Sequence, residues 1–184
     1  MKTGLFFGSF NPIHTGHLSI AQYLLNETDL KKIRFIVSPH NPLKPKSELL
    51  DAELRLDMVR LSIADNPDFE VSDIEFGLPL PSYTAQTLDA LKPGNKDKYA
   101  IIMGSDTLQG LPGWKNPEHI LEYTILVYKR STAFKNPYEG HPNITVLDTP
   151  LLDISASRIR QMLKEKKEIK YLVRDEVINL LKFI

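Results

Sequence analysis

The chain has 184 residues, and its 23 Lys and Arg residues balance its 23 Asp and Glu residues. This length suits one well-buried domain and is too short for two full ones, so we expect a single domain over residues 1–184. The sequence contains no cysteine, which excludes disulfides and thiolate metal sites. The balanced charge, without a long basic stripe, argues against nucleic acid as a partner.

Membrane insertion and export are not expected either. The longest apolar runs, Ala100–Met103 and Tyr123–Tyr128, are far shorter than a membrane span. The first predicted strand begins at the N-terminus, which leaves no signal peptide before it. We therefore expect a cytoplasmic protein that does not bind membranes, and the sequence does not indicate its oligomeric state.

Apolar periodicity and turn residues divide the chain into alternating strands and helices. In chain order, the sequence predicts a strand at Thr3–Phe7, a helix containing Leu18, Ala21 and Leu25, a strand at Lys32–Ser38, a helix at Ala52–Ala64, a strand at Phe69–Ser72, a helix at Thr84–Leu91, strands at Lys98–Met103, Thr124–Tyr128 and Ile144–Leu147, and helices at Ser157–Lys166 and Asp175–Lys182. Such alternation is typical of an α/β fold with right-handed crossovers. We predict a doubly wound, Rossmann-like domain with a mostly parallel sheet and helices on both faces.

Several local features set the ends and faces of these helices. Leu54, Met58 and Leu61 form the expected apolar stripe of the second helix, and Pro93-Gly94 is expected to stop the third. Asp175 is the expected N-cap of the last helix, whose stripe is Val173, Val177 and Leu181. The charged run Lys164–Lys170 is interpreted as a solvated helix end rather than a binding patch.

The segment from Gly8 to Leu18 carries the main functional pattern. His14 and His17 are three residues apart where a helix begins, so both side chains share one face. Free backbone N–H groups and the helix dipole favour an anion at that end, and a polyphosphate suits it. Gly8 would let the backbone approach a ligand, and Gly16 would leave room beside the histidines. The alternative is a turn with two surface histidines.

A second glycine-led turn, Gly104–Asp106, follows another predicted strand. In doubly wound sheets, ligands bind beyond the carboxyl ends of the strands, where strand order reverses. If the two strands are neighbours, both turns border one crevice. Asp106 would then accept hydrogen bonds from ribose hydroxyls, or it would cap the short helix that follows. Neither a P-loop nor a dinucleotide fingerprint occurs, which argues against P-loop hydrolysis and dinucleotide redox chemistry.

A third pattern opens a helix near the C-terminus. Ser155 precedes an apolar face made by Ile159, Met162 and Leu163, so it is a credible N-cap. Ser157 and Arg160 in the first turn would offer a hydroxyl and a guanidinium to phosphate oxygens. Many helices begin with serine and carry an arginine, so this pattern gains weight only beside the first one.

These segments resemble the two signatures of the nucleotidyltransferase superfamily. Gly8–His17 is similar to G-[TS]-F-[DN]-P-x-H-x-G-H, and Ile154–Arg160 to I-S-[ST]-[ST]-x-I-R. Ala156 and Ser157 depart slightly from the commonest form, but Ser157 keeps a hydroxyl. The resemblance implies transfer of a nucleotide monophosphate unit with release of pyrophosphate. The ATP-binding residues it implies, together with the patterns above, are Gly8, Ser9, Phe10, His14, His17, Gly104, Asp106, Ile154, Ser155, Ser157 and Arg160, with His14, His17 and Arg160 as the catalytic ones.

The middle of the chain resembles the bacterial nicotinate-nucleotide adenylyltransferases. Ser82–Leu88 is similar to their S-Y-T-x-x-T-L segment, and Pro39–Lys44 to their P-x-x-P-x-K loop. Gly104–Asp106, Leu111–Asn116 and Tyr171–Val177 also match, so the resemblance covers essentially the whole chain. It implies ATP and nicotinate mononucleotide as substrates, and a Mg²⁺ ion bound through the ATP phosphates.

The residues give this second substrate a physical rationale. Trp114 would stack on the flat nicotinate ring, and the amides that open the helix at Thr84, beside Ser82 and Tyr83, would receive its carboxylate. His40 and Lys44 follow a strand end and suit the mononucleotide phosphate. The alternatives are a core or surface role for Trp114, packing for Tyr83, and a solvated loop for His40. No role is expected for His119 or His141.

The expected chemistry follows from charge. The mononucleotide phosphate is already an anionic nucleophile, so direct in-line attack needs no general base and no covalent intermediate. The sequence shows no carboxylate cluster for a protein-only metal site, as is usual for Mg²⁺ on a nucleotide. Two alternatives remain: a related adenylyltransferase for nicotinamide mononucleotide or phosphopantetheine, and a nucleotide-binding sensor without turnover.

Overall fold

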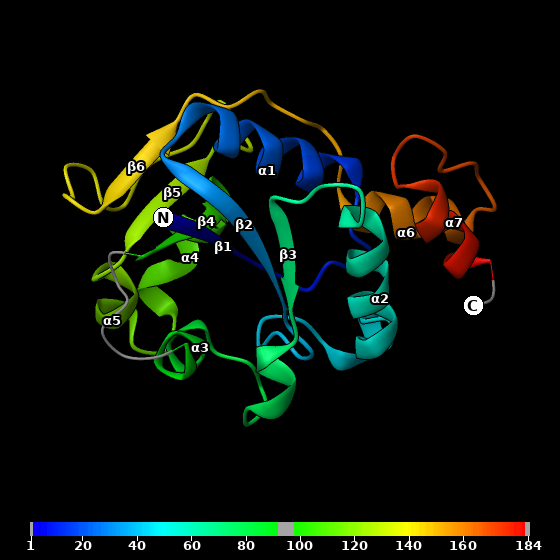
Figure 1. The fold of residues 1–184 in the computed structure, drawn as a ribbon, viewed down its shortest axis with the longest axis horizontal. Helices are drawn as coiled ribbons and strands as arrows, with labels where there is room; N and C mark the ends of the chain where they lie inside the picture. The colour runs from blue at the N-terminus through cyan, green and yellow to red at the C-terminus, as the bar shows by residue number, and fades with distance from the viewer. Residues whose placement is uncertain (1, 92–97, 183–184) are drawn as a thin grey trace.

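The computed structural model describes residues 2–91 and 98–182. Its centre is one six-stranded sheet in the order β3-β2-β1-β4-β5-β6, with every neighbouring pair parallel. The strands are β1 (Lys2–Gly8), β2 (Leu30–Val37), β3 (Phe69–Ser72), β4 (Tyr99–Gly104), β5 (Thr124–Tyr128) and β6 (Ile144–Leu147). The predicted α/β doubly wound architecture is therefore confirmed (Figure 1).

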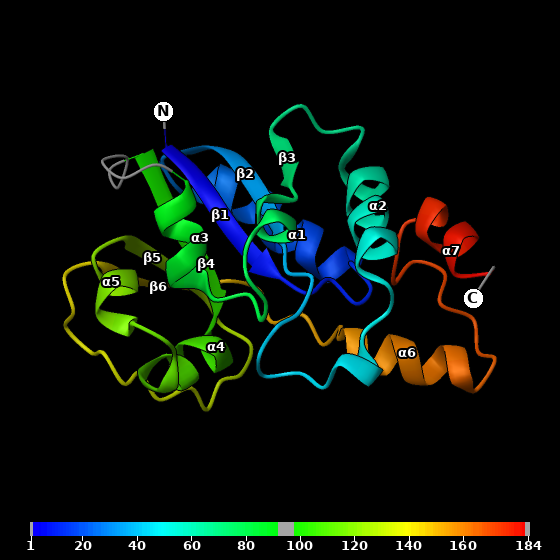
Figure 2. The same cartoon turned by 90° about the horizontal axis from the view of Figure 1, so that it is seen from below.

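Helices cover both faces of the sheet, as predicted (Figures 1 and 2). The α-helices are α1 (Thr15–Glu27), α2 (Ala52–Ile63), α3 (Thr84–Ala90), α4 (Ser105–Gly110), α5 (Pro117–Leu121), α6 (Ala156–Lys164) and α7 (Asp175–Leu181). Short 3₁₀ turns lie at η1 (Lys46–Glu48), η2 (Ile74–Gly77) and η4 (Leu111–Gly113). The expected stop at Pro93-Gly94 lies outside the described residues.

Two buried clusters, one on each face, explain why both layers of helices form. Phe6 of β1 belongs to the cluster that contains residues of α1, α2, α6 and α7. Leu5, its neighbour in sequence, belongs to the cluster that contains residues of α3, α4 and α5. Successive side chains of a strand point to opposite faces, so apolar residues at both positions require cover on both sides.

Two details of the helices differ from the prediction. Met58 is buried and Leu54 packs against the core, as predicted for α2, but Leu61 is 40% exposed, and Arg55, Val59 and Ser62 lie on the buried side instead. Arg174, not Asp175, is the N-cap of α7, and the Asp175 carboxylate instead lies in the first turn, where the helix dipole favours it. The predicted solvated helix end is confirmed for Lys164–Glu168, which are exposed where α6 ends, whereas Ile169 within the charged run is buried.

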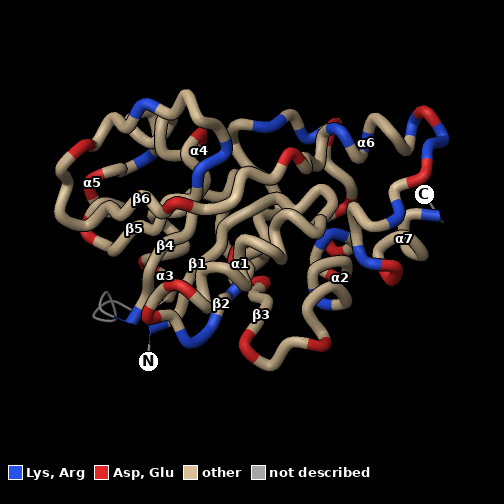
Figure 3. The backbone as a smooth tube through the Cα atoms, turned by 90° about the horizontal axis from the view of Figure 1, so that it is seen from above, with Lys and Arg blue, Asp and Glu red and all other residues tan. Residues whose placement is uncertain are grey.

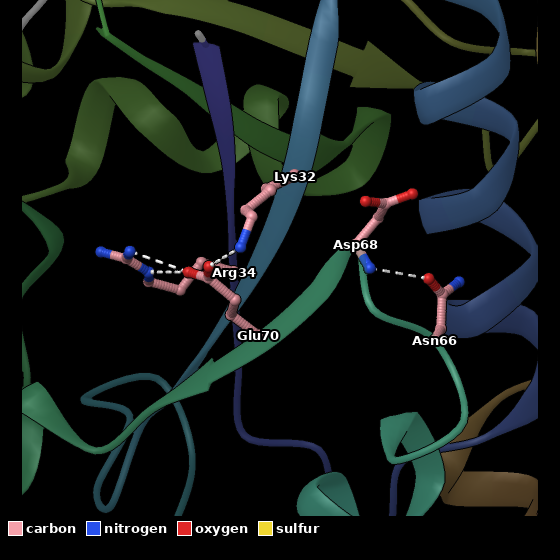
Figure 4. Close-up of polar contacts among 5 residues, drawn as sticks. All are labelled: Lys32, Arg34, Asn66, Asp68 and Glu70. Carbon is pink, nitrogen blue, oxygen red and sulfur yellow. Dashed lines mark hydrogen bonds and ion pairs between the residues drawn. The ribbon is translucent and has the colours of Figure 1, made fainter.

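The short edge strand β3 is held to β2 by an ion cluster (Figure 4). The Glu70 carboxylate accepts from Lys32 Nζ at 2.6 Å and from Arg34 Nη2 at 2.8 Å. Arg34 and Glu70 are register partners across the two strands. Hydrogen bonding from Lys32, then from Arg34, lowers the pKa of Glu70 below its ordinary value. The cluster fixes the register of a strand that has only four residues.

Candidate functional site

The carboxyl ends of β1 and β4 lie side by side, which confirms the condition for a shared crevice. The two strands pair in parallel from Thr3 opposite Tyr99 to Phe6 opposite Ile102. Strand order reverses between them, since β2 and β3 continue on one side and β5 and β6 on the other. Gly8 ends β1 and Gly104 ends β4, so both predicted turns leave the sheet at this switch point.

The loop after β1 is folded over the sheet by Phe10. Its backbone is in the left-handed region, with φ of 43°, and its side chain is buried. The ring packs edge-on to Phe6 and Phe35. A Cβ atom on Gly8 would lie 2.8 Å from the Phe10 ring. Glycine at this position therefore makes room for the Phe10 ring; approach of a ligand to its backbone stays a prediction.

The two histidines of the loop stack at the start of α1, and the turn with two surface histidines is excluded. Their ring centroids are 3.7 Å apart, and His14 is 5% exposed. His17 Nδ1 accepts a hydrogen bond of 3.2 Å from the backbone N–H of His14. A Cβ atom on Gly16 would lie 3.0 Å from His14 Nδ1, so Gly16 does leave the predicted room beside this ring.

Both imidazoles are neutral at neutral pH. Burial, and then the Arg130 guanidinium, lower the pKa of His14 from 6.5 to about 4. Burial, reinforced by His14, Arg130 and Lys44, lowers the pKa of His17 well below its ordinary value. Since Nδ1 of His17 is an acceptor, its hydrogen resides on Nε2. His17 therefore has one N–H donor to offer a ligand.

The helix near the C-terminus approaches this loop from another direction. Ser155 is the N-cap of α6, and its Oγ accepts from the backbone N–H of Arg158 at 3.2 Å, which confirms the predicted cap. Arg160 Nη1 donates to the backbone carbonyl of Asn11 at 2.9 Å, and Nη2 lies 3.4 Å from Ser157 Oγ. The two signatures are thus joined by a direct hydrogen bond between distant parts of the chain.

A small cavity lies between the two signatures and the end of β5. It is lined by His14, His17, Tyr128, Arg130, Leu152 and Ile154, among others. Burial raises the pKa of Tyr128 to about 12, with Arg130 opposing the shift and Asp106 adding to it, so the hydroxyl stays protonated. Because they line the same cavity, the predicted ATP-binding residue Ile154 lies beside both histidines. Arg130 is an additional cation here that no sequence motif indicated.

Asp106 lies beside Gly104 and near Arg130. It is the second residue of α4, whose N-cap is Gly104, so its alternative role as a helix cap is wrong. A Cβ atom on Gly104 would lie 2.5 Å from Asp106 Oδ1, and Arg130 Nη1 is 3.9 Å from Asp106 Oδ2. The Asp106 side chain is exposed at the crevice, and its contact with ribose stays a prediction.

The segments expected to hold the mononucleotide also come together. The backbone N–H of Ser82 donates to the carbonyl of His40 at 2.9 Å, so the loop after β2 lies against the start of α3. Lys115 Nζ lies 4.5 Å from the centroid of the Tyr83 ring, which places the Trp114 loop beside the same segment. Tyr83 is the N-cap of α3, and Trp114 is half-buried against the cluster under α3 to α5.

Lys44 extends the positive charge of the crevice. Loss of hydration, and then the guanidiniums of Arg160, Arg55 and Arg130, lower the pKa of Lys44, while Asp106 opposes the shift. The positive charges of these three guanidiniums therefore extend to Lys44. Figure 3 shows lysines and arginines spread along the described chain rather than gathered on one element. The crevice is thus a local convergence of cations on a molecule without net charge.

The contacts described above do not test the predicted roles of His40 and Trp114. The His40 side chain is half-buried, and its role stays a prediction, like that of Trp114 on a nicotinate ring. His119 Nε2 lies 3.0 Å from Asp89 Oδ1, which joins α5 to α3, so this histidine has a structural contact away from the histidine pair.

Among the residues described, no helix is long and apolar enough to cross a membrane.

Comparison with known proteins defines the class first. Residues 5–162 match the cytidylyltransferase-like family model, and the chain belongs to this family. A probable nicotinate-nucleotide adenylyltransferase of Cytophaga hutchinsonii is 46% identical over 187 residues, covering 98% of this chain and 95% of that protein. The one of Caldicellulosiruptor bescii is 39% identical over 191 residues, covering 99% and 96%. The chain is a member of the nicotinate-nucleotide adenylyltransferase family.

The fold is also shared with solved structures. Nicotinic acid mononucleotide adenylyltransferase of Plasmodium falciparum, complexed with NaAD, matches with a TM-score of 0.81 and 20% identity over 100% of this chain and 96% of that chain. A putative nicotinate-nucleotide adenylyltransferase from Vibrio parahaemolyticus matches with a TM-score of 0.68 and 21% identity, over 98% and 99%. At these identities the likeness concerns the fold.

Proposed function

We propose that the protein transfers AMP from ATP to nicotinate mononucleotide, giving nicotinate adenine dinucleotide and pyrophosphate. The observation that carries the proposal is the meeting of both signatures at the switch point, where Arg160 reaches Asn11 beside the histidine pair. Relatives with identities of 39–46% over nearly their whole length carry the name of this activity. In this proposal ATP would bind beside the histidines, and the mononucleotide phosphate would bind beside Lys44.

The reaction needs positioning rather than a base. An oxygen of the mononucleotide phosphate attacks the α-phosphorus of ATP and forms the new P–O bond. The bond from the α-phosphorus to the bridging oxygen breaks, and its electron pair leaves with pyrophosphate. His17 Nε2–H and the Arg160 guanidinium would donate hydrogen bonds to the charge that grows on the phosphate oxygens. Lys44 would hold the incoming phosphate in line.

A Mg²⁺ ion bound through ATP phosphates is part of this proposal. Within residues 2–91 and 98–182, no three His, Cys, Asp or Glu side chains gather as a metal site. The exposed Asp106 carboxylate, next to Gly104, supplies one oxygen group at the crevice. This donor set fits an ion whose ligands are mostly phosphate and water oxygens. When bound, the ion would neutralise phosphate charge and assist the departure of pyrophosphate.

A pyrophosphate-release assay tests the proposal. ATP is combined in turn with nicotinate mononucleotide, nicotinamide mononucleotide and phosphopantetheine. We expect roughly a hundredfold higher kcat/KM for the acid than for its amide, because a carboxylate satisfies backbone donors near Thr84 better. Equal efficiencies for the acid and the amide would refute the carboxylate site. Pyrophosphate release with phosphopantetheine alone would identify phosphopantetheine, not nicotinate mononucleotide, as the acceptor. Binding of ATP without turnover of any acceptor would identify a sensor.

A further inference from the structure

Arg55 of α2 is a buried arginine that sequence patterns did not assign to the site. Its side chain is 0% exposed. Nη1 donates to the carbonyls of Ser9 at 2.6 Å and Ser38 at 2.8 Å. Nη2 donates to the carbonyl of Pro39 at 2.8 Å, and Nε to that of Leu50 at 2.9 Å. One guanidinium thus binds backbone from three separate segments.

The three segments are the loop after β1 and the two ends of the loop after β2. Residues 39–50 form this second loop, which carries His40 and Lys44 and is mostly exposed in its middle. Arg55 holds its first residue at Pro39 and its last at Leu50. Ser9 belongs to the loop with the histidine signature, so the same side chain joins the two loops.

Asn11 makes a second connection between the same two loops. Its Nδ2 donates to the carbonyl of Glu48 at 2.8 Å, and its Oδ1 accepts from the backbone N–H of Leu50 at 2.9 Å. The Asn11 carbonyl in turn accepts from Arg160. The second loop is therefore anchored to the first at both ends, while its middle, with Leu43 71% exposed, is free of the core.

We propose that Arg55 is a positioning residue that fixes the loop of residues 39–50 relative to the histidine loop, and thereby sets the approach of the mononucleotide phosphate to ATP. This inference rests on the function proposed above. In-line transfer depends on the distance between the two bound polyanions, and small displacements of one substrate reduce rates strongly. Without Arg55, the histidine loop loses one contact, at Ser9, and keeps its bond to Arg160. The loop of residues 39–50 loses contacts at both ends, at Pro39 and Leu50, and keeps the bonds of Asn11 to Glu48 and Leu50.

Arginine is the side chain that suits this task. A guanidinium has five N–H donors in a rigid plane, so it can serve four carbonyls in different directions. A lysine ammonium presents its three donors from one point and cannot reach all four acceptors. The carbonyl oxygens also stabilise the buried positive charge, which would be costly without them. Arg55→Lys therefore keeps the charge but loses the fixed geometry.

Steady-state kinetics of Arg55→Lys test this role, with Arg60→Lys as the matched control. Arg60 lies on the same helix, is exposed and pairs with Asp57 at 3.0 Å. For Arg55→Lys we expect about a tenfold lower kcat and about a fivefold higher KM for the mononucleotide. Equilibrium binding of ATP alone should change by less than about twofold. Arg60→Lys should leave all three quantities at the wild-type values.

Limited proteolysis gives a readout that does not depend on activity. Lys46 is followed by Ser47 in the exposed part of the loop, whereas Lys44 is followed by Pro45, which trypsin cleaves poorly. Release of the loop in Arg55→Lys should raise the initial rate of cleavage after Lys46 by about tenfold at a temperature well below unfolding. Mass spectrometry of the first fragments assigns the cleavage site.

The outcomes separate the inference from the function on which it rests. Adenylyl transfer by the unaltered protein tests the function, and the Arg55 variants test the inference. A folded Arg55→Lys protein with wild-type kinetics and cleavage would overturn the positioning role. A weaker affinity for ATP that accompanies the higher KM for the mononucleotide, together with a lower denaturation midpoint, would also overturn it, since that pattern indicates general destabilisation. Arg55→Met, which removes every donor, should exaggerate both effects of Arg55→Lys if it folds.

Discussion

His17 uses its two ring nitrogens for different tasks, and substitution can separate them. Nδ1 accepts from the backbone N–H of His14 at 3.2 Å, which satisfies an amide at the start of α1. Nε2 carries the one hydrogen of the neutral ring, since the pKa of His17 is well below its ordinary value because of burial, then His14, Arg130 and Lys44. The first task stabilises the fold, and the second would stabilise the transition state.

Asparagine and glutamine each retain one of these tasks. In His17→Asn, Oδ1 takes the place of Nδ1 and accepts from the His14 amide, but nothing occupies the Nε2 position. We expect kcat to fall about a hundredfold, or about 2.7 kcal/mol, as for loss of one oxyanion donor. Stability should stay within about 0.5 kcal/mol of wild type. In His17→Gln, an amide N–H reaches the Nε2 position, and kcat should fall less than about tenfold.

His17→Ala removes both tasks and serves as the reference. It should match His17→Asn in turnover and lose about 1 kcal/mol of stability in addition, because the His14 amide has no acceptor. Urea denaturation measures the stabilities, and pyrophosphate release at saturating substrates measures kcat. Near-normal turnover in a folded His17→Asn protein would remove the Nε2 donor from the mechanism. Equal turnover of the Asn and Gln variants would show that a donor at the Nε2 position does not contribute to catalysis.

Three further predictions concern the two signatures and the tryptophan. Arg160→Lys keeps the charge but cannot bind the Asn11 carbonyl and Ser157 together, so kcat/KM for ATP should fall about tenfold in a folded protein; unchanged ATP kinetics would contradict its phosphate role. The pKa of His14 is lowered to about 4 by burial and then Arg130, so protonation favours unfolding, and ligand-free protein should lose about 2 kcal/mol of this contribution between pH 7 and pH 5. His14→Gln should lack that part of the pH dependence in urea denaturation. Trp114→Ala should raise KM for the acid and amide mononucleotides similarly, because ring stacking does not distinguish them; a selective effect on the acid would assign Trp114 to the carboxylate.

The sheet was predictable because its strands carry apolar residues on both faces. Leu5 and Phe6 are adjacent but belong to different buried clusters, and a strand buries two consecutive apolar residues only when both of its faces are covered. Each predicted strand is present within one or two residues of its expected ends. The short helices α4 and α5 could not be delimited from periodicity, since six and five residues do not complete two turns.

The site was predictable where its chemistry is local. His14 and His17 lie on one turn, and Ser155 caps the helix that carries Arg160, so each pattern can be recognised from spacing. Arg130 could not be recognised in this way. It reaches the histidines from the end of β5, and the lowered pKa values of both rings depend on this distant cation as well as on burial.

Arg55 shows why helical periodicity can hide a functional position. The expected stripe of α2 left Arg55 outside the core, because a charged residue on a helix is ordinarily solvated. The structure buries it because four carbonyls at loop ends have no strand partner and need donors. Such demand arises from loops that are distant in sequence, so it becomes visible only once the fold brings them together. The proposed catalytic groups are encoded in short motifs, whereas the spacing proposed for them depends on a residue that belongs to neither motif.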